Sequence, residues 1–262
     1  MQIIHDYLAL PETAYLGKRV YKKLFFENAD LTAADRRAFT DDIDTVTWQY
    51  TLKPATLNVN TYRDNERDYA ELAVIEVSLR DPKRIARLAE LINRAIPYPM
   101  LLILVHEDRI TLSTAHKRAS RAEADTVIAE DMQLTQWLDP AALEPVEQAF
   151  LNSLALPELP QTHYHALYSA WHQRLLALAC ARLSGTFHVP ESAEARTRQR
   201  EALAACHQLE NDIASLRAEI KKETRFNRQV ELNTRIKALE EEQRATIKAL
   251  SGPVLQAGDN NG

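Results

Sequence analysis

The spacing of the hydrophobic residues changes several times between residues 72 and 117. Leu72–Leu79 alternates with period two, which is typical of a strand, and a stripe at helical spacing follows it. Next come the unbroken apolar run Met100–Val105 and a second alternating stretch, Ile110–Lys117. The pattern predicts strand, helix, strand, strand. Because a helix joins the first two strands, we expect them to be parallel with a right-handed crossover, and Glu107–Arg109 to turn the chain into an antiparallel partner.

Helices are also expected on both sides of this stretch. They cover Glu12–Asn28, Thr32–Asp41, Asp139–Leu154 and Thr162–Leu183. Thr32 and Asp35 have the spacing of a capping box. The pairs Asp81-Pro82 and Asp139-Pro140 each combine a side-chain acceptor with a residue that has no N–H, so each is expected to begin a helix. One more strand, Val46–Leu52, alternates apolar and polar residues. The sequence therefore predicts an α+β fold: a small mixed β-sheet with a βαββ core flanked by helices.

A long helical arm is expected beyond this core. Residues 192–250 contain neither Gly nor Pro, and their apolar residues follow the 4-3-4 spacing of a coiled coil. The first seam comprises Leu209, Ile213, Leu216 and Ile220, and the second comprises Leu232, Ile236, Leu239 and Leu250. The frame shifts within Lys221–Glu231, so the chain there either stutters or folds back into a hairpin. The lack of Gly and Pro favours one continuous helix, about 90 Å long, that pairs with another chain, most simply a second copy.

Composition and charge refine this picture. Of 262 residues 45% are hydrophobic and only 5 are Gly, which suits a helix-rich protein with one main domain and an appendage. We expect an α+β core domain over residues 1–160, a helix and linker over 161–190, the coiled-coil arm over 191–250 and a disordered tail over 251–262. The net charge of −5 gives no sign of a polyanion-binding protein as a whole.

Cellular location is inferred from the cysteines and from hydropathy. Cys180 and Cys206 lie in helical patterns without a metal-ligand spacing, as expected of reduced, buried residues. No signal peptide is recognised, and the longest apolar run is too short to span a bilayer. We therefore expect a cytoplasmic protein without a membrane segment.

Several blocks of sequence resemble a known family. Trp48–Val59 (WQYTLKPATLNV) is similar to a W-x-Y-x-L-x-P-x-T-x-N signature, and Ile92–Leu104 contains an I-P-Y-P block. Lys221–Ile236 (KKETRFNRQVELNTRI) fits the same pattern. The resemblance is to an uncharacterised bacterial family classed as a domain of unknown function. Its members are often encoded beside helicases and DNA methyltransferases in restriction-like or antiphage defence loci. The resemblance implies a genomic neighbourhood and carries over no catalytic residues.

That neighbourhood makes a metal-dependent nuclease the first chemical alternative. Such a site needs two carboxylates for Mg²⁺ and a Lys two residues after one of them on the same strand. Glu76 is the nearest candidate, with Asp64 or Asp68 as the distant partner, but Ser78 occupies the position of the Lys. Alternatively, Glu76 is a polar residue on a solvated face of the sheet.

Three histidines lie close together in the sequence but not in a metal-binding pattern. His163, His165 and His172 are spaced by two and by seven residues on one expected helix. The i, i+4 spacing that lets two histidines share a metal is missing. We expect no metal site and no cofactor.

Positive charge is local rather than general. The candidate nucleic-acid contacts are Lys117, Arg118 and Arg121 at the end of a core strand, with Arg87 and Arg94 on the crossover helix. Clustered Lys and Arg on one surface suffice for phosphate contacts with DNA or RNA. The alternative is a solvated surface of mixed charge.

The favoured function is that of a non-enzymatic interaction or accessory subunit in a bacterial DNA-processing or antiphage defence system. The coiled-coil arm is expected to bind a protein partner, either a second copy or a helicase or methyltransferase subunit. The expected partner-binding residues are Leu209, Ile213, Leu216, Ile220, Phe226, Leu232, Ile236 and Leu239. The alternative function is a degenerate or unusual metal-dependent nuclease subunit that uses Glu76.

Overall fold

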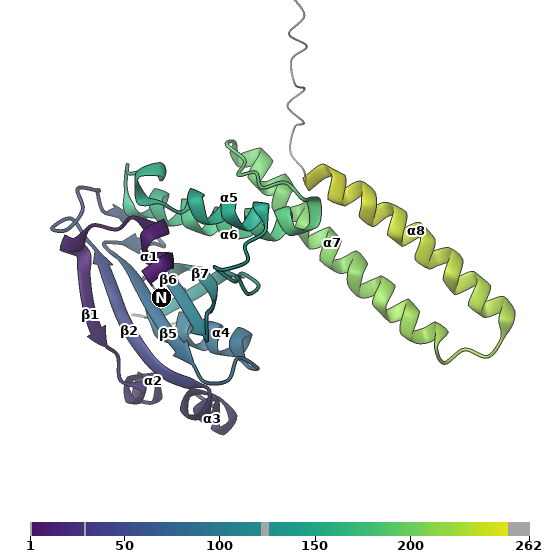
Figure 1. The fold of residues 1–262 in the computed structure, drawn as a ribbon, viewed down its shortest axis with the longest axis horizontal. Coiled ribbons are helices and arrows are strands. Elements are labelled where there is room, and N and C mark those ends of the chain that lie inside the picture. The colour runs from purple at the N-terminus through teal and green to yellow at the C-terminus, as the bar shows by residue number, and fades with distance from the viewer. Residues whose placement is uncertain (1, 29, 122–125, 251–262) are drawn as a thin grey trace, which may run out of the picture. The chain divides into compact units, whose positions relative to one another are not determined.

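The computed structural model describes residues 2–28, 30–121 and 126–250, and these form two compact units. The first unit lies within residues 1–175 and the second within residues 176–262. The division falls inside one continuous helix, α6 (Tyr164–Ser184). Figure 1 shows the sheet of the first unit in purple to teal and the helices of the second unit in green to yellow.

A six-stranded mixed sheet forms the centre of the first unit. Its strands are β1 (Tyr15–Arg19), β2 (Ile43–Leu52), β5 (Leu72–Leu79), β6 (Met100–His106), β7 (Arg109–Ala119) and β8 (Val127–Leu134), in the spatial order β1-β2-β5-β6-β7-β8. Only β5 and β6 run parallel, with Ile75 opposite Leu102, and the other neighbours are antiparallel. The predicted α+β class and βαββ core are therefore confirmed. A separate short pair, β3 (Tyr62–Arg63) and β4 (Asp68–Tyr69), forms a second small sheet.

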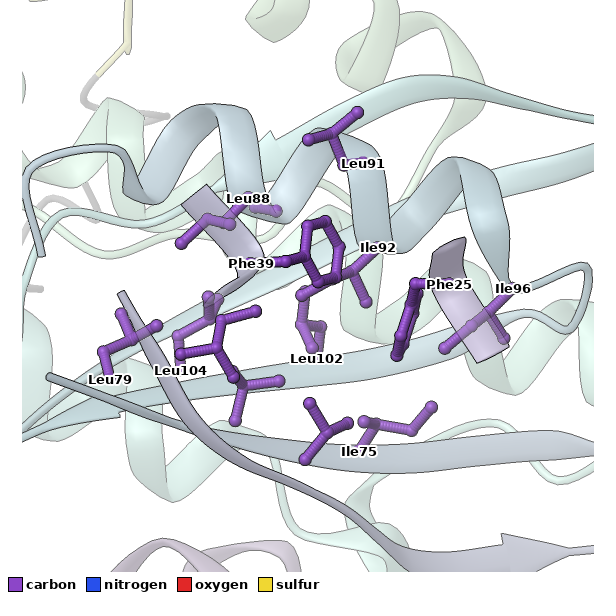
Figure 2. Close-up of a cluster of buried hydrophobic side chains, with 14 of the residues drawn as sticks. Phe25, Phe39, Ile75, Leu79, Leu88, Leu91, Ile92, Ile96, Leu102 and Leu104 are labelled. Carbon is purple, nitrogen blue, oxygen red and sulfur yellow. The ribbon is translucent and has the colours of Figure 1, made fainter. Parts of the chain in front are cut away.

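Three helices cover one face of the sheet. The crossover helix α4 (Ile85–Ala95) packs there with α2 (Lys22–Asn28) and α3 (Ala33–Asp41). Figure 2 shows Phe39 of α3 beside Leu88 and Ile92 of α4, above the strand residues. α3 begins at the predicted capping box, in which the Thr32 hydroxyl accepts from the Asp35 N–H at 3.2 Å. Each large side chain buried in this core contributes roughly 1.5–3 kcal/mol.

The opposite face of the sheet carries α1 (Gln2–Leu8), α5 (Pro145–Ser153) and the first part of α6. The Tyr168 hydroxyl joins α6 to two strands: it accepts from the Ala115 N–H at 2.8 Å and lies 3.0 Å from the Met100 carbonyl. Trp171 donates its indole N–H to the Leu154 carbonyl at 3.1 Å, which ties α6 to the end of α5. Because buried tyrosine and tryptophan need partners for their polar atoms, these bonds fix where the helix lies.

The predicted helix Glu12–Asn28 is wrong. The segment instead forms a short 3₁₀ turn, η1 (Glu12–Ala14), then strand β1 and then α2. Gly17 has a φ of 58°, a left-handed conformation that interrupts a helix and that glycine adopts without steric cost. Tyr15 and Lys18 then pair with β2, and the register shifts between them.

Both Asp-Pro pairs precede their helices by a turn instead of beginning them. The Asp81 carboxylate accepts from the Lys83 N–H at 3.0 Å, and α4 begins only at Ile85. In the same way Asp139 accepts from the Ala141 N–H at 2.9 Å, while α5 begins at Pro145. An aspartate bonded two residues ahead forms a local turn that competes with the first turn of a helix.

The second unit is a helical hairpin. It consists of α7 (Ala193–Ile220) and α8 (Phe226–Leu250), which are antiparallel and joined by Lys221–Arg225 (Figure 1). The expectation of one continuous helix is therefore wrong: the seams face each other within the chain. Ion pairs between the two helices include Arg217 with Glu240 at 2.7 Å.

The last turns of α6 pack at the base of this hairpin. Their apolar cluster contains Leu176, Cys180, Leu203, Cys206 and Leu250. Both cysteines are free and buried, as predicted. The tail predicted to be disordered, residues 251–262, lies outside the described residues. Among the helices that the structure describes, none is both long and apolar enough to cross a bilayer.

Candidate functional site

Lys117, the centre of the predicted phosphate-binding group, is buried and bonded to the backbone. Only 3% of the residue is exposed, and its Nζ donates to the Asn93 carbonyl in the last turn of α4. Four residues after Asn93 stands Pro97, which has no N–H to complete the helical pattern. Lys117 supplies the missing donor, and burial lowers the pKa of its amine to about 7.

The two arginines after Lys117 are engaged by carboxylates. Arg118 donates to Glu130 at 2.8 Å, and Glu130 also accepts from Arg67 at 2.9 Å. Arg121 forms an ion pair with Glu66, whose pKa falls because of that contact. The cavity beside them, about 250 Å³, is lined by acidic as well as basic side chains. The end of β7 is thus a surface of mixed charge.

The predicted arginines on α4 are also paired. Arg87 donates to both oxygens of Asp35 at 2.9 and 3.0 Å, and these bonds hold the pKa of Asp35 well below its usual range. Arg94 lies 3.5 Å from Glu90. The Arg87–Asp35 pair fixes α4 to the start of α3, so Arg87 has a structural role.

The carboxylates considered for a nuclease lie in different surroundings. Glu76 is buried on β5, with its Oε2 3.1 Å from Nε2 of His5 in α1. Asp64 accepts the backbone N–H groups of Glu66 and Arg67 in the turn between β3 and β4. Within the described part of the chain, no three His, Cys, Asp or Glu residues are placed to hold a metal ion.

The histidines of α6 contact neighbours on the sheet. His172 is buried between the Thr114 hydroxyl at 3.1 Å and the Asp131 carboxylate at 3.3 Å. The ring of His116 on β7 lies 4.5 Å from that of His172. Burial, together with the nearby His172 and His165, lowers the pKa of His116 to about 3. The packing between α6 and the sheet therefore favours the neutral form of the His116 imidazole.

His163 has a different role at the start of α6. Its Nδ1 accepts from the Ala166 N–H at 3.0 Å. The ring thereby satisfies one of the free amides that every helix N-terminus presents.

The turn of the hairpin is made by a side chain rather than by Gly or Pro. An oxygen of Glu223 accepts from the backbone N–H groups of Thr224 and Arg225 at 2.9 and 2.8 Å, which fixes the turn just before α8. The Arg225 guanidinium pairs with the same carboxylate, and these contacts lower the pKa of Glu223 to about 2. Gln229 donates to the Glu223 carbonyl at 2.6 Å. The turn is therefore a defined structure.

The predicted partner-binding residues divide into two groups. Leu209, Ile213, Leu232 and Ile236 are buried, while Leu216, Ile220 and Leu239 are partly buried. Phe226 is 75% exposed, and Val230, one helical turn later, is 48% exposed. The seams are thus closed inside the hairpin, and the open apolar surface is the hairpin tip, which we define as Lys221, Lys222, Phe226 and Val230.

A basic and aromatic edge was missed by the sequence analysis because its residues were assigned to a helix. Lys18 and Arg19 end β1, and Tyr21, Lys22 and Lys23 follow. The signal was present in the sequence: Tyr15–Phe26 contains four cationic and four aromatic residues and no acidic one. Only the assignment of Tyr15–Arg19 to an edge strand shows that these basic and aromatic residues lie together at the rim of the sheet.

Comparison with known proteins gives one match. The model of the family described as "Domain of unknown function (DUF4391)" matches residues 8–242. The chain belongs to this family. No curated protein and no solved structure matches it. The DUF4391 region contains the whole sheet, all of α6 and α7, and α8 as far as residue 242, so both units and the hairpin tip lie within it.

Proposed function

We propose that this DUF4391 protein is a non-enzymatic accessory subunit that joins a larger DNA-processing or antiphage defence assembly through its hairpin tip. One observation carries the proposal: Phe226 and Val230 are exposed on a hairpin whose other large apolar side chains are buried or partly buried where the structure describes them. The two side chains are four residues apart on α8, so they form one face. A large aromatic side chain on a fixed helix is the kind of anchor that dominates protein interfaces.

The charges of the tip indicate what its partner presents. Arg225 and Arg228 are neutralised by Glu223, Glu219 and Glu231. Lys221 and Lys222 make no ion pair with any residue that the structure describes. The fitting partner is a protein with an apolar pocket for Phe226 and carboxylates at its border. A helicase or methyltransferase encoded nearby is the candidate that the family resemblance favours.

The ordered turn supports this role. Because the Glu223 carboxylate bonds the Arg225 N–H and Gln229 bonds the Glu223 carbonyl, the turn before Phe226 is fixed before any partner arrives. Binding then costs little ordering entropy, which favours affinity.

The test is to purify the chain and any helicase or methyltransferase encoded beside its gene and to measure binding by isothermal titration calorimetry. Phe226→Ser with Val230→Ser is expected to weaken binding by at least about tenfold, the effect of losing one anchor. The matched control, Arg235→Ser with Lys237→Ser, changes exposed residues further along α8 and is expected to bind like wild type.

Two outcomes would count against the proposal. If the tip variant binds as well as the control, the interface lies elsewhere. If neither neighbouring protein binds at micromolar concentration, the accessory role in that system is wrong. Circular dichroism of both variants checks that the helices remain folded.

A further inference from the structure

The edge of the sheet at β1 is exposed and carries a concentration of positive charge. Among the described strands β1 lies at the edge of the sheet and pairs with β2 alone, and all five of its residues are exposed. The segment Tyr15–Phe26 has a charge of about +4 in a chain whose net charge is −5. The edge therefore attracts anions although the molecule as a whole does not.

Three cations of this edge, Lys18, Arg19 and Lys23, are more available than those predicted from the sequence, whereas the fourth, Lys22, donates its Nζ to the Ile43 carbonyl. Lys18 and Arg19 form no ion pair with any residue in the described part of the chain. Lys23 pairs with Glu27 at 3.3 Å, but both side chains are exposed, so water and salt screen the contact. Lys117, Arg118, Arg121 and Arg87, by contrast, are each held by a carbonyl or a carboxylate.

Exposed aromatic rings accompany these cations. Tyr21 is 67% exposed, and the Arg19 guanidinium lies 5.9 Å from the centre of its ring. Tyr98 is 42% exposed and stands edge-on to Trp48, with their ring centres 5.7 Å apart. In the strand register Lys18 is directly opposite Trp48, so the cation and the aromatic pair are neighbours.

A groove of about 500 Å³ is lined in part by Trp48 and Tyr98. Among the residues that the structure describes, its lining is mostly apolar, including Val20, Leu24, Trp48 and Tyr98, and Arg94 is the one charged residue there. Apolar walls with a single guanidinium suit a flat, uncharged ring that is attached to an anion.

Edge protection explains only part of this pattern. Charged residues, a register shift and Gly17 all discourage an edge strand from pairing with another chain, and they are sufficient to account for Lys18 and Arg19. Protection does not require exposed tyrosines or an apolar groove. Both are needed where a ligand has flat faces as well as negative charge.

We propose that the β1 edge binds single-stranded nucleic acid, with phosphates on Lys18 and Arg19 and bases stacked on Tyr21 and Tyr98. Single strands expose their bases, and stacking on aromatic side chains is the usual way proteins hold them. A duplex would offer phosphates but no free base faces. An acidic protein would match the cations but leave the rings without a role. This inference is independent of the hairpin tip.

The first experiment measures binding of a fluorescent 20-nucleotide poly(dT) strand by anisotropy at several salt concentrations. Lys18→Glu with Arg19→Glu is expected to weaken binding at least tenfold and to lower the salt slope by about 1.4, since each phosphate contact on a single strand contributes about 0.7. Arg235→Glu with Lys237→Glu makes an equal change in net charge on α8 and is expected to have little effect.

The second experiment separates stacking from charge. Tyr21→Leu is expected to weaken binding roughly tenfold with the salt slope unchanged, because a base–ring contact involves no counterion release. Tyr98→Leu tests the ring that lines the groove in the same way. Phe226→Ser with Val230→Ser is expected to bind the strand like wild type, so the two proposals can fail separately.

Three results would overturn this inference. If the Lys18/Arg19 and Arg235/Lys237 charge reversals weaken binding of the strand equally, the binding reflects the net charge of the protein and not a site at the β1 edge. Binding of a duplex as tightly as of the single strand would remove the role of the rings. Binding of polyglutamate with displacement of the oligonucleotide would assign the edge to an acidic protein.

Discussion

At the scale of single residues, Lys117 shows how the backbone of one element decides the role of a side chain on another. Pro97 leaves the Asn93 carbonyl without its helical donor, and an unpaired buried carbonyl costs about 1–3 kcal/mol. Lys117 meets that need from β7 at the cost of burying an amine. In the sequence, Lys117 precedes two arginines at a strand end and resembles a surface cation. The alternating pattern shows that Lys117 lies on a strand, but it does not show that the last turn of α4 packs against that strand. From the sequence alone, a Lys117 that binds phosphate therefore cannot be distinguished from one that binds the Asn93 carbonyl.

The pH dependence of stability tests this role of Lys117. The pKa of the amine is about 7 in the folded protein and 10.5 without burial. Between these values the unfolded chain binds the proton and the folded chain resists it, so the free energy of unfolding rises with pH from 7 to 10.5. Lys117→Met removes this group. Between pH 7 and pH 10, we expect the free energy of unfolding of wild type to rise by on the order of 3 kcal/mol more than that of the variant.

Urea denaturation of both proteins at pH 7, 8.5 and 10 measures this difference, and other titrating groups cancel in the comparison. At pH 10, where the amine is neutral, the variant is expected to be the less stable by about 1–3 kcal/mol because the Asn93 carbonyl has lost its donor. Stability curves that run parallel across the whole pH range would show that Lys117 ionises freely.

At the scale of elements, side-chain patterns identified which residues are buried better than they identified where the chain turns. The apolar spacing identifies the seams Leu209–Ile220 and Leu232–Leu250 and allows either a stutter or a hairpin between them, but the absence of Gly and Pro favours the continuous helix, which is wrong. The chain reverses there in a turn without Gly or Pro, in which the Glu223 carboxylate accepts from the backbone N–H groups of Thr224 and Arg225. The same limit applies to β1: its apolar spacing also fits a helix, and only the pairing with β2 and the left-handed Gly17 make it a strand.

The hairpin offers a direct comparison between a buried and an exposed apolar residue on one helix. Leu232 is buried in the seam and Phe226 is exposed at the tip. Leu232→Ala is expected to lower the stability of the hairpin by about 2–4 kcal/mol, the usual cost of a cavity at a packed position. Phe226→Ser is expected to change it by less than about 0.5 kcal/mol. Thermal unfolding followed by circular dichroism distinguishes the two, and a large loss in Phe226→Ser would mean that the tip is part of the hairpin core.

At the scale of the whole molecule, the fold class was accessible from the sequence because the sheet core is local in the chain. β5, α4, β6 and β7 are consecutive and carry the strongest apolar patterns, so their order determined the topology. The candidate surfaces were less accessible. The β1 edge becomes visible only when Lys18 and Trp48 are placed opposite each other. The hairpin tip is recognisable only once the seams are known to close on each other.

Closure of the seams also predicts the oligomeric state. A coiled-coil arm needs a second chain to bury its stripe, but here α7 and α8 bury theirs against each other. We therefore expect light scattering to give one mass near 29.8 kDa for the full chain at micromolar concentration. A chain ending at residue 190 is expected to remain folded, because the core around Phe39 and Leu88 lies wholly within residues 25–104. Leu176 and Cys180 are changed to Ser in that shorter chain, since the hairpin normally covers them. A dimer mass for the full chain that is lost on removal of the hairpin would restore self-association through the arm.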